Sequence, residues 1–249
     1  MLEIHLLVAL GFAGLAAGFV DAVAGGGGLI SIPALLLAGV PPVSALATNK
    51  LQSVVGTAVA ALTYWRKGFV ALKPLLPAIL ATLVGGVLGA LLVRQLDTSL
   101  LRALVPVALI AIAGYFLFAP NLSEADSTRR LNFSVFVPVM GFGFGFYDGV
   151  FGPGTGSFFT IGFVTLFGLG ILRAAGHTKM LNFTSNFAAL LVFVPAGDVL
   201  WPAALAMAVG QMVGGYVGAR AGIRFGARLI RPLVVVMSVV MAVRLLFGG

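Results

Sequence analysis

The sequence predicts an all-α integral membrane protein built from two inverted-topology repeats. Of its 249 residues, 60% are hydrophobic and 9% are charged, which is too little charge to cover the surface of a soluble domain of this length. Apolar stretches of about 20 residues, the length that crosses a bilayer as a helix, recur along the whole chain. In each repeat we expect four long transmembrane helices and one short half-helix that follows a glycine-rich break.

The long apolar stretches predict eight transmembrane helices, at residues 4–24, 44–64, 74–93, 100–118, 132–150, 175–195, 200–219 and 230–247. Two further apolar stretches, 29–39 and 157–169, are too short to cross a bilayer as a helix, and each follows a run of glycines. They are typical of half-helices that end inside the membrane. The first stretch carries Glu3 and His5 in place of a basic leader, so we expect it to be retained as a span.

The repeat is indicated by a constant shift between the halves. With a shift of 129 residues, KLQS from Lys50 aligns with KMLN from Lys179, and VGGVLGA from Val84 aligns with VGGYVGA from Val213. Upstream, GFVDAVAGGGG aligns with GFYDGVFGPGTG at a shift of 127, so a two-residue length difference lies between the glycines and the lysine. We predict a first membrane repeat at 1–118, a polar cytoplasmic linker at 119–131 and a second membrane repeat at 132–249.

The distribution of basic residues favours inverted repeats. If each half crosses the membrane an odd number of times, the two halves have opposite orientations. The cytoplasmic side then collects most of the basic residues: Arg66, Lys67, Lys73, Arg129, Arg130, Arg173, Arg220, Arg224, Arg228 and Arg231. Arg94 and Arg102, on either side of Asp97, are exceptions. Topology therefore explains the net charge of +8, and we expect no nucleic-acid partner.

Five ionisable residues are expected at membrane depth: Asp21, Lys50, Asp148, His177 and Lys179. A charge there costs several kcal/mol unless it faces protein or water and has a partner. The structural interpretation is one Asp–Lys ion pair within each half. Asp21 and Asp148 are also candidates for proton coupling, and His177 is a candidate either for proton transfer or for a hydrogen bond in the core.

The two glycine-rich breaks, 25–28 and 152–156, are candidates for anion binding. Backbone N–H groups just before a helix, together with the helix dipole, attract negative charge, and glycine lets the backbone approach the ligand. The alternative is close helix packing, which we favour for the glycines at 85–89 and 214–218. Polar side chains follow at 47–53 and 176–182. The predicted substrate-binding residues are Gly25, Gly26, Gly27, Gly28, Asn49, Lys50, Gln52, Gly152, Gly154, Thr155, Thr178, Lys179 and Asn182.

The chain resembles the TauE/SafE sulfite exporter family, also called the toluene sulfonate uptake permeases. The residues that carry the resemblance are GFVDAVAGGGGLISIPALLLAGVPPVSALATNKLQS at 18–53, GFYDGVFGPGTGSFF at 145–159 and AAGHTKMLNFTSN at 174–186. The resemblance implies a multi-pass carrier of the inner membrane, associated with export of sulfite or sulfoacetate and with transport of other small sulfur-containing or carboxylate anions. Pro153 interrupts the second glycine run, so the halves need not contribute equally.

We therefore expect a secondary transporter of small anions that works by alternating access around a site at mid-membrane. The expected partners are the anionic substrate, the lipid bilayer, protons as a coupling ion and a second copy of the chain. A passive anion channel with the same glycines and lysines is the alternative. We expect no enzymatic activity, metal or cofactor, because the chain has no cysteine, only two histidines, and isolated carboxylates that form no catalytic set. The absence of a G-x-x-x-x-G-K-[ST] loop disfavours ATP-driven transport by this chain alone.

Overall fold

The computed structural model describes residues 3–97, 126, 131–226 and 228–229, and in these residues the chain is helical. The helices are α1 (Ile4–Ala24), α2 (Gly28–Leu37), α3 (Pro42–Arg66), α4 (Leu72–Gln95), α6 (Phe133–Val150), α7 (Thr155–Thr165), α8 (Ile171–Phe193) and α9 (Trp201–Phe225). Six of the eight predicted spans and both predicted half-helices correspond to these elements. The spans predicted at 100–118 and 230–247 lie outside the described residues.

The helix ends follow from local sequence. Helix α1 ends where Gly25 adopts a left-handed conformation, with φ of 81°, and its N–H bonds to the carbonyl of Asp21, which is the usual role of glycine after a helix. Helix α3 begins with Pro42, whose fixed φ suits the first helical position. Helix α6 begins at Asn132, whose side chain accepts a hydrogen bond from the N–H of Ser134.

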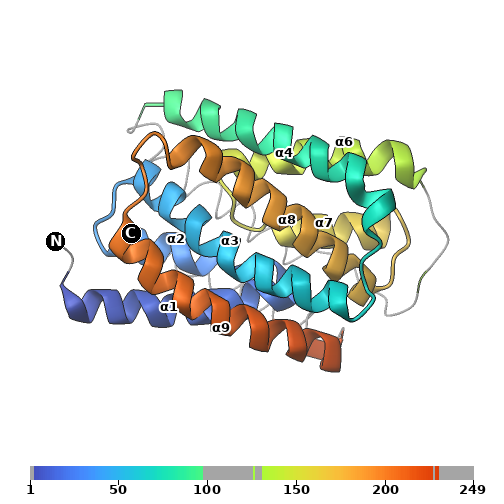
Figure 1. Ribbon diagram of the computed structural model, residues 1–249, viewed down its shortest axis with the longest axis horizontal. Helices are drawn as coiled ribbons and strands as arrows, with labels where there is room; N and C mark the ends of the chain where they lie inside the picture. Colours follow the sequence, from blue (N-terminus) through green and yellow to red (C-terminus); the bar gives the residue numbers. More distant parts are fainter. Residues whose placement is uncertain (1–2, 98–125, 127–130, 227, 230–249) are drawn as a thin grey trace, which may run out of the picture.

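The long helices form a bundle in which the halves are interleaved. Helices α1 and α9 lie along one edge, α4 and α6 along the opposite edge, and α3 and α8 between them (Figure 1). The most extensive helix contacts are α1 with α9 and α4 with α6, and both join one half of the chain to the other. In the same view α1, α3 and α9 run from left to right, whereas α6, α8 and α4 run from right to left.

Glycines make the two edge contacts close, and they do so at matching positions. A Cβ on Gly85 of α4 would lie 2.3 Å from the carbonyl oxygen of Phe142, and one on Gly214 of α9 would lie 2.1 Å from that of Leu15. These are the positions that the sequence comparison aligns. Gly89 against Phe146 and Gly218 against Phe19 repeat the correspondence. The prediction that the glycines at 85–89 and 214–218 serve close packing is confirmed.

The outward faces of the edge helices are apolar. On α1, the exposed side chains include Ile4, Val8, Phe12 and Leu15, and α4, α6 and α9 carry similar stripes of leucine, valine and phenylalanine. By length and composition, α1, α4 and α6 could each cross a membrane. Such stripes would be unfavourable against water and are favourable against lipid. The membrane assignment is thus consistent with both the helices and their exposed surface.

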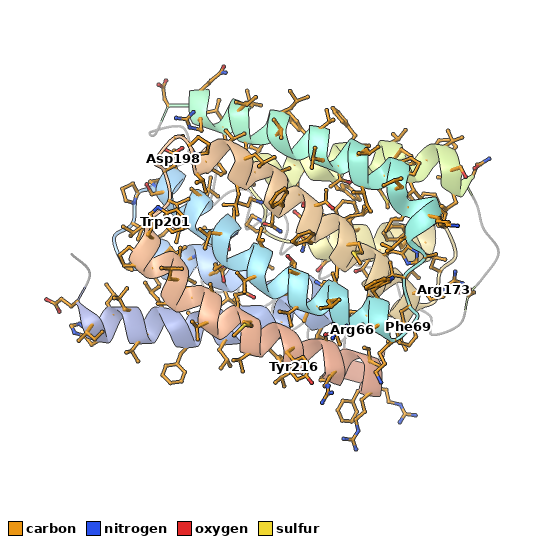
Figure 2. All side chains as sticks on the ribbon, in the orientation of Figure 1. Arg66, Phe69, Arg173, Asp198, Trp201 and Tyr216 are labelled. Atoms are coloured by element: carbon orange, nitrogen blue, oxygen red, sulfur yellow. The ribbon has the colours of Figure 1, made fainter. Side chains whose placement is uncertain are left out.

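The two ends of the bundle differ in charge. Arg66 and Arg173 lie at one end, next to Phe69, whereas Asp198 and Trp201 lie at the other (Figure 2). Lys67 and Lys73 belong to the same connection as Phe69. Arg94 is at the opposite end, where its side chain bonds to Asp198 at 2.7 Å. The arrangement agrees with the predicted collection of basic residues on one side.

Candidate functional site

The two glycine-rich breaks meet in the interior of the bundle. A Cβ on Gly25 would lie 2.3 Å from the carbonyl carbon of Gly156, and one on Gly28 would lie 3.2 Å from Cα of Pro153. The Ser157 hydroxyl donates a hydrogen bond of 2.5 Å to the carbonyl of Ala24, just before the first break. Segments that are about 130 residues apart in sequence are therefore joined backbone to backbone. Any side chain at these glycines would separate them.

The first break is held by Asp21 and Lys179. The Asp21 carboxylate accepts a hydrogen bond of 3.4 Å from the N–H of Gly27, within the break, as expected for a residue that anchors the unwound segment. The Lys179 ammonium, on α8, donates a hydrogen bond to the carbonyl oxygen of Asp21. Its Nζ also lies 3.7 Å from Oδ1 of the same residue. Both the carboxylate and the ammonium are thus tied to the end of α1.

The second break lies against Lys50 and Asp148. Lys50 Nζ, on α3, is 3.0 Å from Asp148 Oδ1 near the end of α6, and the two side chains are 1% and 2% exposed. This contact is a buried ion pair at hydrogen-bonding distance. A Cβ on Gly152, whose φ is 91°, would lie 2.8 Å from that Nζ. Glycine at this position therefore leaves the room that the ammonium occupies.

The prediction of one ion pair within each half is wrong. Asp21 of the first half pairs with Lys179 of the second, and Asp148 of the second half pairs with Lys50 of the first. The physical reason is the interleaved packing, in which α3 and α8 lie side by side and the long lysine side chain of each reaches the broken helix of the other half. Each pair buries two opposite charges, so the membrane interior carries no uncompensated charge at these four positions.

The remaining predicted residues divide between two clusters of polar side chains beside the breaks. Asn49 Oδ1 accepts hydrogen bonds from Ser31, at 2.5 Å, and from Gln52, at 2.8 Å. In the other half, the Thr160 hydroxyl donates to that of Thr178 at 3.1 Å. The predicted substrate-binding residues thus lie at the crossing of the two breaks or in these two clusters: Gly25, Gly26, Gly27, Gly28, Asn49, Lys50, Gln52, Gly152, Gly154, Thr155, Thr178, Lys179 and Asn182.

Sequence reasoning missed several residues that hold the breaks. Ser31 and Thr160 both join a half-helix to the helix that follows, and they align at the same shift of 129 as Lys50 and Lys179. That alignment was the signal that could have found them. It also places the two-residue length difference upstream of Ser31, inside the breaks. Ser157 and Tyr147 give no comparable signal, because their partners are backbone carbonyls fixed only by the fold.

His177 lies apart from the crossing, at the basic end of α8. Its ring packs against Phe133 and Phe163, with centroid distances of 6.2 and 5.6 Å. Its Nδ1 is 2.7 Å from the carbonyl of Arg173, and its Nε2 faces the N–H of Ala71 at 3.5 Å. The structure therefore gives His177 the hydrogen-bonded position in the core. A cavity of about 150 Å³ beside it is lined by Ala71, Pro74, Phe133, Ser134, Leu169, Arg173 and His177.

Comparison with known proteins identifies the family. Residues 10–245 match the family described as sulfite exporter TauE/SafE, which is nearly the whole chain. The chain belongs to the TauE/SafE family. This membership agrees with the resemblance seen in the residues around both glycine-rich breaks. No solved structure matches the chain.

Similar TauE/SafE proteins are described as transporters. The chain is 51% identical to a probable membrane transporter protein, ORF9, of Sinorhizobium sp. The 210 aligned residues are 84% of this chain and 80% of that protein. It is 45% identical over 206 residues to the probable membrane transporter protein YfcA of Escherichia coli, covering 83% and 77%. A probable membrane transporter protein of Haemophilus influenzae is 43% identical over 209 residues, covering 84% and 82%. The matches place the chain among membrane transporters.

Proposed function

We propose that the chain is a secondary transporter that exports small sulfur-containing or organic anions across the inner membrane, with sulfite or a sulfonate as substrate. The observation that carries the proposal is the crossing of the two breaks, each beside a lysine that is 1% exposed. A buried ammonium next to unwound backbone suits an anion, because charge-assisted hydrogen bonds strengthen where water is excluded. An exporter of sulfite is also what the family's description names.

The proposed binding residues are the glycines of both breaks together with Asn49, Lys50, Gln52, Thr155, Thr178, Lys179 and Asn182. In this interpretation the aspartates hold the lysines in place when the site is empty. An arriving anion then competes with a carboxylate for an ammonium, so the ammonium keeps an ionic partner at every stage. The neutral polar groups supply the remaining hydrogen bonds to the oxygen atoms of the solute.

We propose that the halves are inverted-topology repeats and that transport proceeds by alternating access. The support is twofold: helices at aligned positions run in opposite directions in Figure 1, and the contacts of α1 with α9 recur between α6 and α4. Such repeats usually place the substrate at mid-membrane between discontinuous helices. Because α9 packs on α1 and α4 on α6, we expect the moving bodies to be these two edges of the bundle.

The test is flux into proteoliposomes with radiolabelled sulfite, sulfoacetate and acetate as probes. We expect saturable uptake of at least one sulfur-containing anion by the unaltered protein. Lys50→Ala and Lys179→Ala should each reduce it by about tenfold or more, the value of one hydrogen bond to a charged group. Lys67→Ala is the matched control, since Lys67 is exposed at the basic end, and it should transport normally.

Two outcomes would count against the proposal. Full flux in both Lys50→Ala and Lys179→Ala would remove the site, provided that each variant elutes as a single species in detergent. Flux that rises linearly with concentration, accompanied by single-channel conductance in a planar bilayer, would favour a passive anion channel built from the same residues. Lys50→Arg keeps the charge and controls for loss of folding in the alanine variant.

A further inference from the structure

The two buried ion pairs have equivalent positions but different surroundings. Asp21 and Asp148 align in the repeat, as do Lys179 and Lys50, and each pair joins one half to the other. If the two halves were symmetric, the two ion pairs would also make equivalent hydrogen bonds. They do not. The difference distinguishes an ion pair that stabilises the structure from one that is available for proton transfer.

In the Asp21 pair, both side chains also bond to the backbone around the first break. The carboxylate bonds to the N–H of Gly27, and the carbonyl of Asp21 accepts from both the N–H of Gly25 and the ammonium of Lys179. A Cβ on Gly27 would lie 2.7 Å from the Cβ of Asp21, so the turn is also packed directly on this residue. Removing Asp21 from its partners would release the first break as well as the ion pair.

The second break does not need its aspartate. The Tyr147 hydroxyl donates to the carbonyl of Pro153 at 2.7 Å, and the Thr155 hydroxyl donates to the carbonyl of Gly152 at 2.8 Å. In the first half, Val20 aligns with Tyr147 and residues 25–28 are all glycine, so neither hydroxyl group has a counterpart there. Two other side chains therefore do for the second break what Asp21 does for the first.

As a result, the Lys50–Asp148 pair keeps unused hydrogen-bonding capacity. Within the described residues, Asp148 Oδ2 is a fully buried oxygen without a hydrogen-bond partner, and the ammonium of Lys50 has the other carboxylate oxygen, at 3.0 Å, as its polar contact. No side-chain atom of Asp21 or Lys179 is both fully buried and without a partner. Buried polar atoms are normally satisfied, so those that are not call for a functional explanation. Lys50 Nζ also faces the backbone of the Gly152 turn, where a Cβ would lie 2.8 Å from it.

The charged neighbourhood of Asp148 is simple. Lys50 reaches it from α3, and Asp21 lies near enough to act electrostatically on Lys50. Tyr147 precedes it on α6, while α4 faces this part of α6 with Gly86, Gly89 and Ala90. On α8, Lys179 is committed to Asp21 and His177 lies against Phe133, at the far end of α6. Lys50 is thus the one direct ionic partner of Asp148 among the described residues.

We propose that Asp148 is the carboxylate that carries the coupling proton, and that the Lys50–Asp148 pair opens during transport while the Lys179–Asp21 pair stays closed. This inference rests on the proposed function. An anion that binds Lys50 adds a negative charge beside Asp148. A proton taken from water by Oδ2 converts the carboxylate to a neutral acid, which offsets one negative charge of the anion. On release of the anion the proton returns to water, and Lys50 and Asp148 pair again. Because the cycle is reversible, the anion is exported where its outward gradient exceeds the inward gradient of the proton.

The proposal is tested in proteoliposomes with radiolabelled sulfoacetate, whose acidic groups are ionised near neutral pH and bring no proton of their own. With the membrane potential clamped at zero, a pH one unit lower outside should concentrate the anion about tenfold inside if one proton accompanies it. Asp148→Asn should abolish this accumulation, because an amide cannot carry the proton, while sulfoacetate exchange stays measurable at whatever rate. Asp21→Asn is the matched control and should still accumulate about tenfold, whatever its rate.

Three outcomes would overturn the assignment: tenfold accumulation by Asp148→Asn, loss of accumulation by an Asp21→Asn protein that still exchanges sulfoacetate, or flux in the unaltered protein that ignores the pH gradient. Absence of any sulfoacetate flux in the unaltered protein would instead remove the proposed function and this inference with it. Infrared difference spectroscopy with charge-conserving variants covers a failure of Asp148→Asn to fold. Sulfoacetate should produce the carbonyl band of a protonated carboxyl, shifted by Asp148→Glu and unshifted by Asp21→Glu; the reverse pattern, or no band, contradicts the proposal.

Discussion

Gly25 and Gly152 occupy matching places, each with a positive φ just after a long helix, yet the chain beyond them is stabilised differently. After Gly25, the turn depends on a carboxylate, and the nearest atoms are the rigid backbone of Gly156 and Ser157. After Gly152, the turn depends on two hydroxyl groups, and the nearest atom is the mobile end of a lysine. Duplicated segments can thus keep the same backbone conformation while different side chains stabilise it in each repeat.

The comparison implies that the two breaks have different roles. The first break is rigidly built into the crossing, so its substitutions should affect stability above all. The second break adjoins the ion pair with unused hydrogen-bonding capacity, so its substitutions should affect transport above all. Four experiments test whether the two breaks differ in this way, and the expected effects decrease from the first to the last.

The largest effect is expected for Gly25→Ala. The new methyl group would lie 2.3 Å from backbone of the opposite break, and alanine is also strained at a φ of 81°. Overpacking and strain together should destabilise the protein by about 3 kcal/mol or more. Gly39→Ala is the control, because Gly39 has a φ of 78° with open space around it, and strain alone should cost about 1 to 2 kcal/mol. Thermal unfolding in detergent measures both, and equal losses would show that the crossing is not tight.

Gly152→Ala should separate stability from transport. Its methyl group would meet Lys50 Nζ at 2.8 Å and Asp148 Oδ1 at 3.3 Å, and the lysine side chain can move away. We expect a stability loss close to that of Gly39→Ala, about 1 to 2 kcal/mol, together with at least about a tenfold loss of anion flux because Lys50 is displaced. Normal flux in proteoliposomes would contradict a role for this turn in binding.

Tyr147→Phe removes the hydroxyl that holds Pro153 and little else. The lost hydrogen bond should lower the free energy of unfolding by about 1 kcal/mol. Tyr64→Phe is the matched variant beside the first break, where the hydroxyl is 3.5 Å from the carbonyl of Ala22 and bonds weakly. Unfolding in detergent should therefore show the smaller loss for Tyr64→Phe. A Tyr147→Phe variant as stable as the unaltered protein would mean that Asp148, after all, supports the second break.

Arg94→Ala gives the baseline for an ion pair outside both breaks. Arg94 and Asp198 are 38% and 20% exposed, so water and salt screen their contact. The expected loss is about 0.5 kcal/mol, typical of exposed pairs, and it should shrink further at high salt. Anion flux should be unchanged. A loss comparable to those of the break variants would mean that burial is not what distinguishes the central pairs.

Much of the fold could be predicted because it depends on local composition. The expected 4–24 coincides with α1, 74–93 lies within α4, and 200–219 begins one residue before α9 and ends within it, since long apolar runs and the glycines or prolines near them determine helix ends. Helix α8 begins four residues before its predicted start at 175, because the turn that contains Arg173 is helical although it carries a charge. Apolarity alone therefore locates the span and misses a first turn that a charged residue interrupts.

The site was predicted in its residues and not in its pairing. Buried Asp, Lys and glycine stand out against an apolar sequence, so Asp21, Lys50, Asp148 and Lys179 could be recognised singly. Which carboxylate meets which ammonium depends on packing between helices far apart in the chain, and nothing in the local pattern contains that information. The hydroxyl groups of Ser157 and Tyr147 were missed for the same reason, because each bonds to a backbone carbonyl.

The exchange of ionic partners also constrains the assembly of the chain at the ribosome. Asp21 and Lys50 are synthesised well before Asp148 and Lys179, and neither has its final partner until the second half arrives. The amino-terminal helices therefore enter the bilayer with two charges that have not reached their final partners. Their insertion becomes permanent only as the later helices are translated and dock against them.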